Sequence, residues 1–332
     1  MTLKAVAAHL GLSAGTVSSV LNDAPSAKHI PQATRQRILV AARQLDYRPN
    51  FFARSLRKRR TMTIGVIAHA IGDSYGSSVI AGIESGVRQK SYFFLTGIHR
   101  HDSELFERYA RLLMQRGAEG LITVDYNLAH AMPVPVVAIP GHTENEGVIN
   151  IVLDHRHAAN LALRHLKELG HKKIAVFRGN EQSADAESRW NATNEVAREM
   201  CLNIDPELVI RLGSIDPTPN LGYPYAKELL ARKKPFTALL AYNDISAIGA
   251  IRAFQEAGLK VPEDISVVGF DDIPAAAFHH PSLTTIHQPL QRMGELAAEV
   301  LIEKIEGRDG IERELAVQPE IVVRESTARV HS

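Results

Sequence analysis

The stretch GLSAGTVSSVLND, residues 11–23, predicts two short helices that meet at a tight turn. Gly11 follows an apolar helical face and suits a helix C-cap, because glycine adopts a left-handed backbone at little cost. Ser13 suits the N-cap of the next helix, since its hydroxyl can accept a backbone N–H of the first turn. Two helices joined in this way form a helix-turn-helix, and a three-helix bundle of another function is the alternative.

Apolar side chains on both sides of the turn supply a small core. The helix before the turn carries them at Leu3, Val6, Ala7 and Leu10, and the helix after it at Val17, Val20 and Leu21. A third helix begins near Pro31, which suits a first helical turn. The buried stripe of this third helix is expected to be Ile38, Leu39, Ala42 and Leu45.

Charge is distributed unevenly along the chain. Residues 1–61 contain 11 lysines and arginines but two acids, a charge of +9, whereas the remaining residues contain 27 bases and 35 acids, a charge of −8. A basic segment beside an acidic body indicates that the first segment meets a polyanion such as nucleic acid. A solvated basic surface is the alternative interpretation.

The composition is that of a globular protein of two or three domains. The chain has 332 residues, of which 45% are hydrophobic and 23% charged. We find no apolar run long enough to span a bilayer and no secretory signal, so we expect a cytoplasmic protein without a membrane partner. The single cysteine, Cys201, cannot form an internal disulfide and is expected to be at least half-buried.

The body alternates short apolar runs with helix-period segments. The run TIGVIAHA at residues 63–70 precedes the helical segment SSVIAGIESGVRQK at 77–90, and the pattern continues to ISVVGFDD at 265–272. Such alternation predicts an α/β fold with parallel sheets covered on both faces. The runs are too many for one small sheet, so we expect two lobes with a ligand site at the carboxyl ends of their strands.

The motifs together resemble the lactose-repressor (LacI/GalR) family of bacterial transcription regulators. The headpiece matches are Ala7, Gly11, Leu12, Ser13, Thr16, Val17, Ser18, Val20, Leu21, Asn22, Thr34, Arg35 and Ile38. The following matches are Tyr47, Pro49, Asn50, Ala53, Arg54, Ser55 and Leu56. The resemblance continues over nearly the whole chain.

The resemblance implies a modular architecture. A three-helix headpiece at residues 1–48 is followed by a hinge helix and linker at 49–61. A periplasmic-binding-protein-like sensor of two doubly wound parallel sheets then has an N-terminal lobe at 62–153 plus 289–314 and a C-terminal lobe at 154–288 plus 315–328. The chain is expected to cross between the lobes near residues 153–156, 285–291 and 315–319.

The resemblance also implies a surface that binds double-stranded operator DNA. Its residues are Thr2, Leu3, Ser13, Ala14, Gly15, Thr16, Ser18, Ser19, Asn22, Arg35, Tyr47, Asn50, Ala53, Arg54 and Leu56. Ala14 and Gly15 occupy the base-reading positions, where they offer little to base edges. Leu56 matches the family's intercalating leucine, so we hypothesise that the protein reads the deformability of the operator centre.

For the sensor, the resemblance implies a site for a small effector. Its residues are Tyr75, Ser183, Asp185, Arg189, Asn243, Asp271 and Gln288. Arginine, aspartate and asparagine suit a polyhydroxyl ligand, so a sugar-like effector is expected, with a phosphorylated sugar or a less polar ligand as alternatives.

The predicted function is that of a homodimeric transcriptional repressor with no cofactor, metal or catalytic site. An enzyme using His279, His280, Asp271 and Asp272 is one rival interpretation, but adjacent histidines lack the i, i+4 spacing of helical metal ligands. A transport protein is the other rival, and it has no use for a basic headpiece. No heptad helix follows the sensor, so no coiled-coil tetramer is expected.

Overall fold

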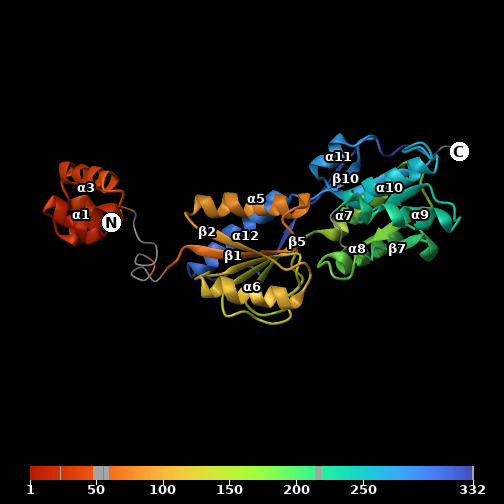
Figure 1. Cartoon of the computed structure of the whole chain (residues 1–332). Helices are drawn as coiled ribbons and strands as arrows, with labels where there is room; N and C mark the ends of the chain where they lie inside the picture. The colour runs from red at the N-terminus through yellow and green to blue at the C-terminus, as the bar shows by residue number, and fades with distance from the viewer. Residues whose placement is uncertain (23, 48–54, 56–59, 214–217, 331–332) are drawn as a thin grey trace. The chain divides into compact units, whose positions relative to one another are not determined.

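The computed structural model describes residues 1–22, 24–47, 55, 60–213 and 218–330. They form two compact units, Met1–Thr61 and Met62–Ser332. Figure 1 colours the chain from its N-terminus to its C-terminus. None of the described helices is both long and apolar enough to cross a bilayer.

The first unit is the predicted helix-turn-helix bundle. Its helices are α1 (Leu3–Leu10), α2 (Ala14–Leu21), the short 3₁₀ helix η1 (Pro25–His29) and α3 (Gln32–Gln44). Gly11 ends α1 with a left-handed φ of 65°, and the hydroxyl of Ser13 accepts the N–H of Thr16 at 3.0 Å. Both predicted caps are therefore confirmed.

The core of this bundle differs from expectation at one position. Its buried members are Val6, Ala7, Val17, Val20, Ala27 and Ile38. Leu39 was expected inside but is 38% exposed, whereas Ala41 and Ala42 are buried. The helical period explains this correction, because residues three and four after Ile38 share its face and the adjacent residue is rotated away.

The sensor contains two six-stranded sheets. The first has the order β11-β5-β4-β3-β1-β2, and all its pairs are parallel. Its strands are β1 (Thr63–Ala68), β2 (Phe93–Ile98), β3 (Leu121–Val124), β4 (Val136–Ile139), β5 (Val148–Leu153) and β11 (Glu314–Val317). Helices α5 (Ser74–Gln89) and α12 (Leu290–Ile305) cover one face, and α6 (Ser103–Gln115) covers the other (Figure 1).

The second sheet has the order β12-β10-β9-β8-β6-β7. Its strands are β6 (Ile174–Arg178), β7 (Val209–Arg211), β8 (Ala238–Leu240), β9 (Ser266–Asp271), β10 (Thr284–His287) and β12 (Glu320–Val322). All pairs are parallel except that of β10 with β12, which is antiparallel.

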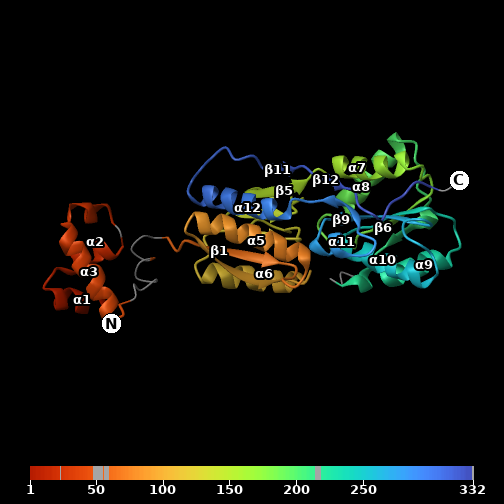
Figure 2. The same ribbon diagram turned by 90° about the horizontal axis from the view of Figure 1, so that it is seen from above.

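Helices cover both faces of the second sheet (Figure 2). One layer is α7 (His155–Glu168) with α8 (Ala186–Glu199), and the other is α9 (Tyr223–Ala231) with α10 (Asp244–Glu256). The shorter elements are η2 (Pro206–Leu208), η3 (Pro219–Leu221) and α11 (Pro274–Phe278). Consecutive strand residues alternate between the two layers, since Val176 packs with α7 and α8 whereas Phe177 packs with α9 and α10.

The chain passes between the two sheets three times, after β5, after β10 and after β11. Strand β11 still pairs with β5 as far as Val317, so the chain leaves the first sheet three residues later than the expected boundary after residue 314. Cys201, expected to be at least half-buried, is exposed in a left-handed turn after α8. Cys201 lies in the turn that ends α8, between the C-cap Met200 and the buried Leu202, outside the helix that packs on the sheet.

The contact between α5 and α12 depends on glycine. A Cβ on Gly82 would overlap the carbonyl oxygen of Gln291, and one on Gly294 would overlap the carbonyl oxygen of Val79. The two backbones can therefore approach closely. Helix α12 carries the chain from β10 of the second sheet back to the first, and α5 is its neighbour there.

Gly82→Ala should lower the free energy of unfolding of the sensor by about 1–3 kcal/mol, because the helices must separate to accept the methyl group. Thermal and urea unfolding measure this loss. Gly72→Ala is the matched control, since no heavy atom lies within 4 Å of its added Cβ. Equal effects of the two substitutions would contradict the packing argument.

Candidate functional site

The polar side chains of α2 mainly hydrogen bond within the headpiece. Ser13 Oγ lies 2.8 Å from Thr16 Oγ1, and Asn22 Nδ2 donates to the carbonyl oxygen of Ser18 at 2.8 Å. Ser26 donates its hydroxyl to that of Ser19 at 3.1 Å. These bonds hold the ends of α2 and leave few long groups that could reach beyond the helix.

Gly15 is exposed on the first turn of α2, next to half-buried Ala14. A Cβ on Gly15 would meet only Ser13 Oγ, at an ordinary contact distance of 3.7 Å. The headpiece fold therefore has room for a larger residue here. Glycine stands at this position even though it costs about 1 kcal/mol of helix propensity relative to alanine.

The other predicted headpiece residues lie at the edges of the bundle. Thr2 caps α1 by accepting the N–H of Ala5, and Leu3 and Tyr47 pack against the bundle core. Arg35 lies on α3 with its Nε buried and without a hydrogen-bond partner among the described residues. Asn50, Ala53, Arg54 and Leu56 lie outside the described residues.

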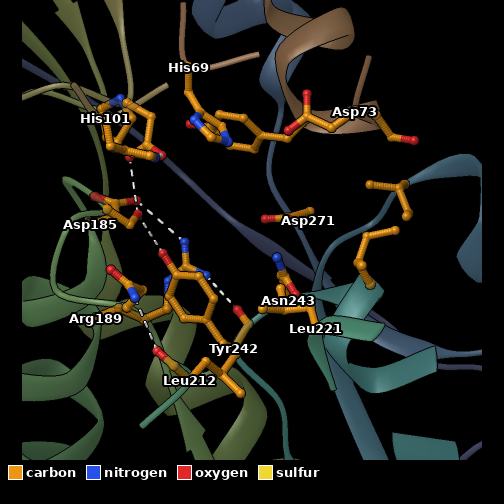
Figure 3. Close-up of a pocket in the computed structure, with 18 residues that line it drawn as sticks. His69, Asp73, His101, Asp185, Arg189, Leu212, Leu221, Tyr242, Asn243 and Asp271 are labelled. Atoms are coloured by element: carbon orange, nitrogen blue, oxygen red, sulfur yellow. Dashed lines mark hydrogen bonds and ion pairs between the residues drawn. The ribbon is translucent and has the colours of Figure 1, made fainter. Parts of the chain in front are cut away.

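A cleft opens in the sensor at the carboxyl ends of strands from both sheets (Figure 3). The space between its walls, counted to the open mouth, is about 840 Å³. Six predicted effector residues line it, namely Tyr75, Ser183, Asp185, Arg189, Asn243 and Asp271. The structure thus brings together residues that are up to 196 positions apart in the chain.

The seventh predicted residue, Gln288, does not line the cleft. Its side chain is 2% exposed and donates Nε2–H to Asp271 Oδ1 at 2.7 Å. Gln288 follows β10, the neighbour of β9, so its side chain reaches Asp271 from the adjacent strand. It supports a lining carboxyl group, and its role as an effector contact stays a prediction.

Arg189 lies in the first turns of α8 and is held on several sides. Its Nη1 donates to the carbonyl oxygen of Tyr242 at 2.6 Å, and its Nη2 lies 3.4 Å from Asp185 Oδ2. Its guanidinium carbon lies 3.7 Å from the ring centre of Phe270 and 4.6 Å from that of Tyr242. Stacking and pairing of this kind suit arginine and compensate for burial of its charge.

Asp185 is less available to a ligand than expected. Its Oδ1 lies 2.6 Å from His142 Nε2 and 2.8 Å from His155 Nε2. Burial alone would raise the pKa of Asp185, but His155, His142 and Arg189 together hold it well below its usual range. Asp185 is therefore an anion whose acceptors mostly serve neighbouring side chains.

Asp125 is a cleft residue that the motifs did not indicate. It follows β3 in the first lobe with a left-handed φ of 56°. Its Oδ1 accepts the hydroxyl of Ser183 at 3.1 Å and the N–H of Ala184 at 2.8 Å, both in the second lobe. Its position directly after an apolar run is a signal that could have identified it.

Two histidines also line the cleft without having been predicted. His69 follows β1 and His101 follows β2, and their ring centres lie 4.2 Å apart. His101 Nε2 lies 3.4 Å from Asp125 Oδ2. Burial lowers the pKa of His69, and the neighbouring His101 lowers it further. Figure 3 shows both histidines across the cleft from Arg189.

The carboxyl groups of β9 and α10 form a buried pair. Burial raises the pKa of Asp271, and the charge of Asp244 raises it further. Burial also raises the pKa of Asp244, to about 7, and the charge of Asp272 adds to this rise. Asp244 accepts the hydroxyl of Thr285 at 2.5 Å and the N–H of Ile273 at 2.8 Å. Asn243 caps α10 by accepting the N–H of Ser246, so its amide N–H₂ is the group that it can offer to a ligand.

The residues of the rival enzyme interpretation do not form one constellation. His279 Nδ1 lies 3.0 Å from the carbonyl oxygen of Pro281, while Asp272 pairs with Arg324 at 2.6 Å and with His287 at 3.0 Å. Among the described residues, the group with the spacing to hold a metal ion is His142, His155 and Asp185. Both histidines already lie at hydrogen-bond distance from Asp185, and Asp185 also faces Arg189.

Arg189→Lys should lower the free energy of unfolding of the sensor by about 1–3 kcal/mol, because an ammonium group cannot replace both the stacking and the bond to Tyr242. The matched control is Arg156→Lys, whose guanidinium pairs with Glu199 on the surface and should contribute less than about 1 kcal/mol. Urea unfolding compares the two variants, and equal losses would contradict a special role for Arg189.

Comparison with known proteins agrees with this geometry. Residues 2–50 match the family described as bacterial regulatory proteins, lacI family, and residues 163–327 match a periplasmic binding protein-like domain. The chain is 33% identical over 342 residues to the HTH-type transcriptional repressor PurR of Haemophilus influenzae, with 99% of each chain covered.

Solved structures agree as well. The lac repressor dimer bound to operator and the anti-inducer ONPF is 28% identical, with 99% of each chain covered and a TM-score of 0.88. The complex of the transcriptional regulator CelR with cellobiose is 26% identical, with 98% of this chain and 99% of that chain covered and a TM-score of 0.71. The chain therefore belongs to the lacI family of bacterial regulatory proteins and is a DNA-binding transcriptional repressor, not an enzyme.

Proposed function

We propose that the protein binds a palindromic operator as a homodimer and changes its operator affinity when a small metabolite enters the cleft. The observation that carries this proposal is the combination of a helix-turn-helix unit with a cleft walled by two sheets. A C2 dimer presents two headpieces to the two halves of a palindrome. The lac repressor dimer on its operator supports this arrangement. Because bacterial operators lie in the cytoplasm, we propose that the protein acts there.

Operator recognition in this proposal depends on close approach and DNA shape. Ala14 can contact a thymine methyl group, and Gly15 adds no side chain, so direct base readout by α2 is sparse. The headpiece fold does not require glycine at position 15. We therefore attribute Gly15 to close approach between the start of α2 and the base edges. Leu56, outside the described residues, would supply the central wedge.

The chemistry of the cleft favours a ligand without negative charge. Asp73, Asp125 and Asp271 line it, and Arg189 is the sole lysine or arginine among the described lining residues. Because Arg189 already faces Asp185, a phosphate group would meet carboxylates without a free cation. This argues against the phosphorylated sugar among the alternatives.

We propose an uncharged polyhydroxy effector of the sugar class. Aspartate oxygens accept hydroxyl protons, Asn243 offers an amide donor, and Tyr75 offers a ring face. The similar protein solved with cellobiose supports this class. A purine is the alternative, because the sequence relatives carry the name PurR.

Ligand binding would act on DNA through the angle between the lobes. Asp125 of the first lobe already contacts Ser183 and Ala184 of the second, so any ligand between them changes a contact that spans the cleft. A coupling free energy of about 1–3 kcal/mol is sufficient for regulation.

Selection of operators from a random duplex library by the full-length protein should enrich inverted repeats, and the affinity should fall steeply with salt because many phosphates are contacted. Gly15→Ala should stabilise the headpiece by about 1 kcal/mol yet cost about 1–3 kcal/mol of binding to the selected operator. Thermal unfolding and fluorescence anisotropy measure the two effects.

Gly72→Ala in the sensor is the control and should keep wild-type operator affinity. If Gly15→Ala binds the selected operator as tightly as wild type, α2 does not approach the bases as proposed. Enrichment of single, unrepeated half-sites would contradict the dimer.

A thermal-shift screen should compare neutral mono- and disaccharides, sugar phosphates and purine bases. A neutral sugar should stabilise the wild type, by about 2.7 kcal/mol at a hundredfold excess over Kd, and Arg156→Lys equally. Arg189→Lys should show a reduced response, because the cleft wall that Arg189 holds is altered. A response to phosphates or purines alone would overturn the proposed effector class.

A further inference from the structure

One segment of the second lobe, residues 183–185, is contacted from the first lobe at two points. Asp125 holds Ser183 and Ala184, as described above. His142, in the segment between β4 and β5, holds Asp185 through a Nε2–Oδ1 distance of 2.6 Å. Asp185 in turn faces Arg189. A chain of contacts thus runs from the first lobe to the arginine of the cleft.

The hydrogen-bond chemistry assigns the protons in this cluster. His142 and His155 both direct Nε2 at Asp185 Oδ1, so each must carry a proton on Nε2 to donate. The Nδ1 of His155 is buried and has no hydrogen-bond partner among the described residues. The side chain of His142 is 24% exposed, against 6% for His155. His142 is therefore the member that can exchange a second proton with solvent.

The surroundings of His142 favour its charged form. Burial lowers the pKa of His142, but the hydrogen bond and charge of Asp185, followed by the charge of Glu314 on β11, raise it. Arg189 opposes them, and the net direction is upward. These contacts exist only while the lobes are closed, because His142 and Asp185 belong to different lobes.

The other interlobe contact behaves differently. Burial would raise the pKa of Asp125, but His101, the N–H of Ala184 and His69 lower it below its ordinary value. Asp125 therefore stays ionised through the neutral range, and its grip on Ser183 and Ala184 does not follow pH there.

We propose that His142 is a pH-sensitive positioning residue, which ties the first lobe to Arg189 through Asp185 and favours closure of the lobes when it is protonated. This inference goes beyond the proposed function, since it holds whatever ligand enters the cleft. It does not make His142 a ligand contact, because His142 is not among the residues that line the cleft.

The direction of the effect follows from linkage. The closed form binds the His142 proton more tightly than the open form, so protonation stabilises closure. The gain is fully present below the ordinary histidine pKa of about 6.5 and is lost as pH rises through the raised value. His69 acts in the opposite direction, since its lowered pKa makes its protonation unfavourable in the closed cleft. Asp73 and Asp271, whose pKa values are raised, act in the same direction as His142.

The test measures closure directly in the full-length protein. The natural Cys201 is exposed in the second lobe, and Arg111→Cys on α6 places a second thiol on the surface of the first. Spin labels on both sites report interlobe distances by double electron–electron resonance, at about pH 6 and about pH 8.5 in buffer containing EDTA. The ratio of closed to open molecules should be severalfold higher at the lower pH.

His142→Gln keeps an N–H that can reach Asp185 but cannot be charged, so most of this pH response should disappear. His130→Gln is the matched control in the same lobe, because His130 faces Glu107 on the surface at 3.3 Å, and it should respond as wild type. Circular dichroism verifies that all variants are folded. The proposal is overturned if the ratio of closed to open molecules does not change with pH in the wild type. It is also overturned if His142→Gln lowers this ratio by the same factor at both pH values, so that the wild-type pH response persists.

Discussion

The buried guanidinium of Arg189 is the constraint on which the cleft depends. Burying an unpaired charge costs several kcal/mol, so the fold must supply partners for it. Asp185 supplies the opposite charge, Tyr242 a carbonyl oxygen, and Phe270 with Tyr242 the stacking surfaces. These partners come from the connection between β6 and α8, from the segment after β8 and from β9 itself, and these three strands are neighbours in the second sheet. The wall of the cleft is therefore organised by the protein's own electrostatics before any ligand enters.

That organisation extends to the other lobe. Asp185 can hold Arg189 and still accept from His142, because a carboxylate has two oxygens with several lone pairs. Asp125 contacts the neighbouring residues from the same side. The contact of His142 depends on a proton whose pKa the site raises, whereas Asp125 has a lowered pKa and stays ionised. Closure in the proposed mechanism therefore combines a constant contact with a pH-dependent one. The three chain crossings between the sheets permit such closure without separating the lobes.

The headpiece contacts DNA through interactions other than those that organise the cleft. Its excess of basic residues provides attraction to phosphates without sequence information. The hydroxyls of α2 are occupied in capping and bracing the helix, as with Ser13 and Ser19. Little direct readout is left, which is why shape and close approach at Gly15 carry the proposed specificity.

Local patterns in the sequence determined the helix-turn-helix with its caps at Gly11 and Ser13 and the α/β class of the body, and the resemblance of short motifs to the family indicated Arg189 and Asn243. These features depend on neighbours a few positions away, so a single stretch contains the information. Only the tertiary structure decided that Gln288 contacts Asp271, that Leu39 faces outward, and that Asp125 and His142 meet the segment 183–185. Those contacts join strand ends far apart in the chain, and their geometry depends on sheet order and lobe closure, which no local pattern encodes.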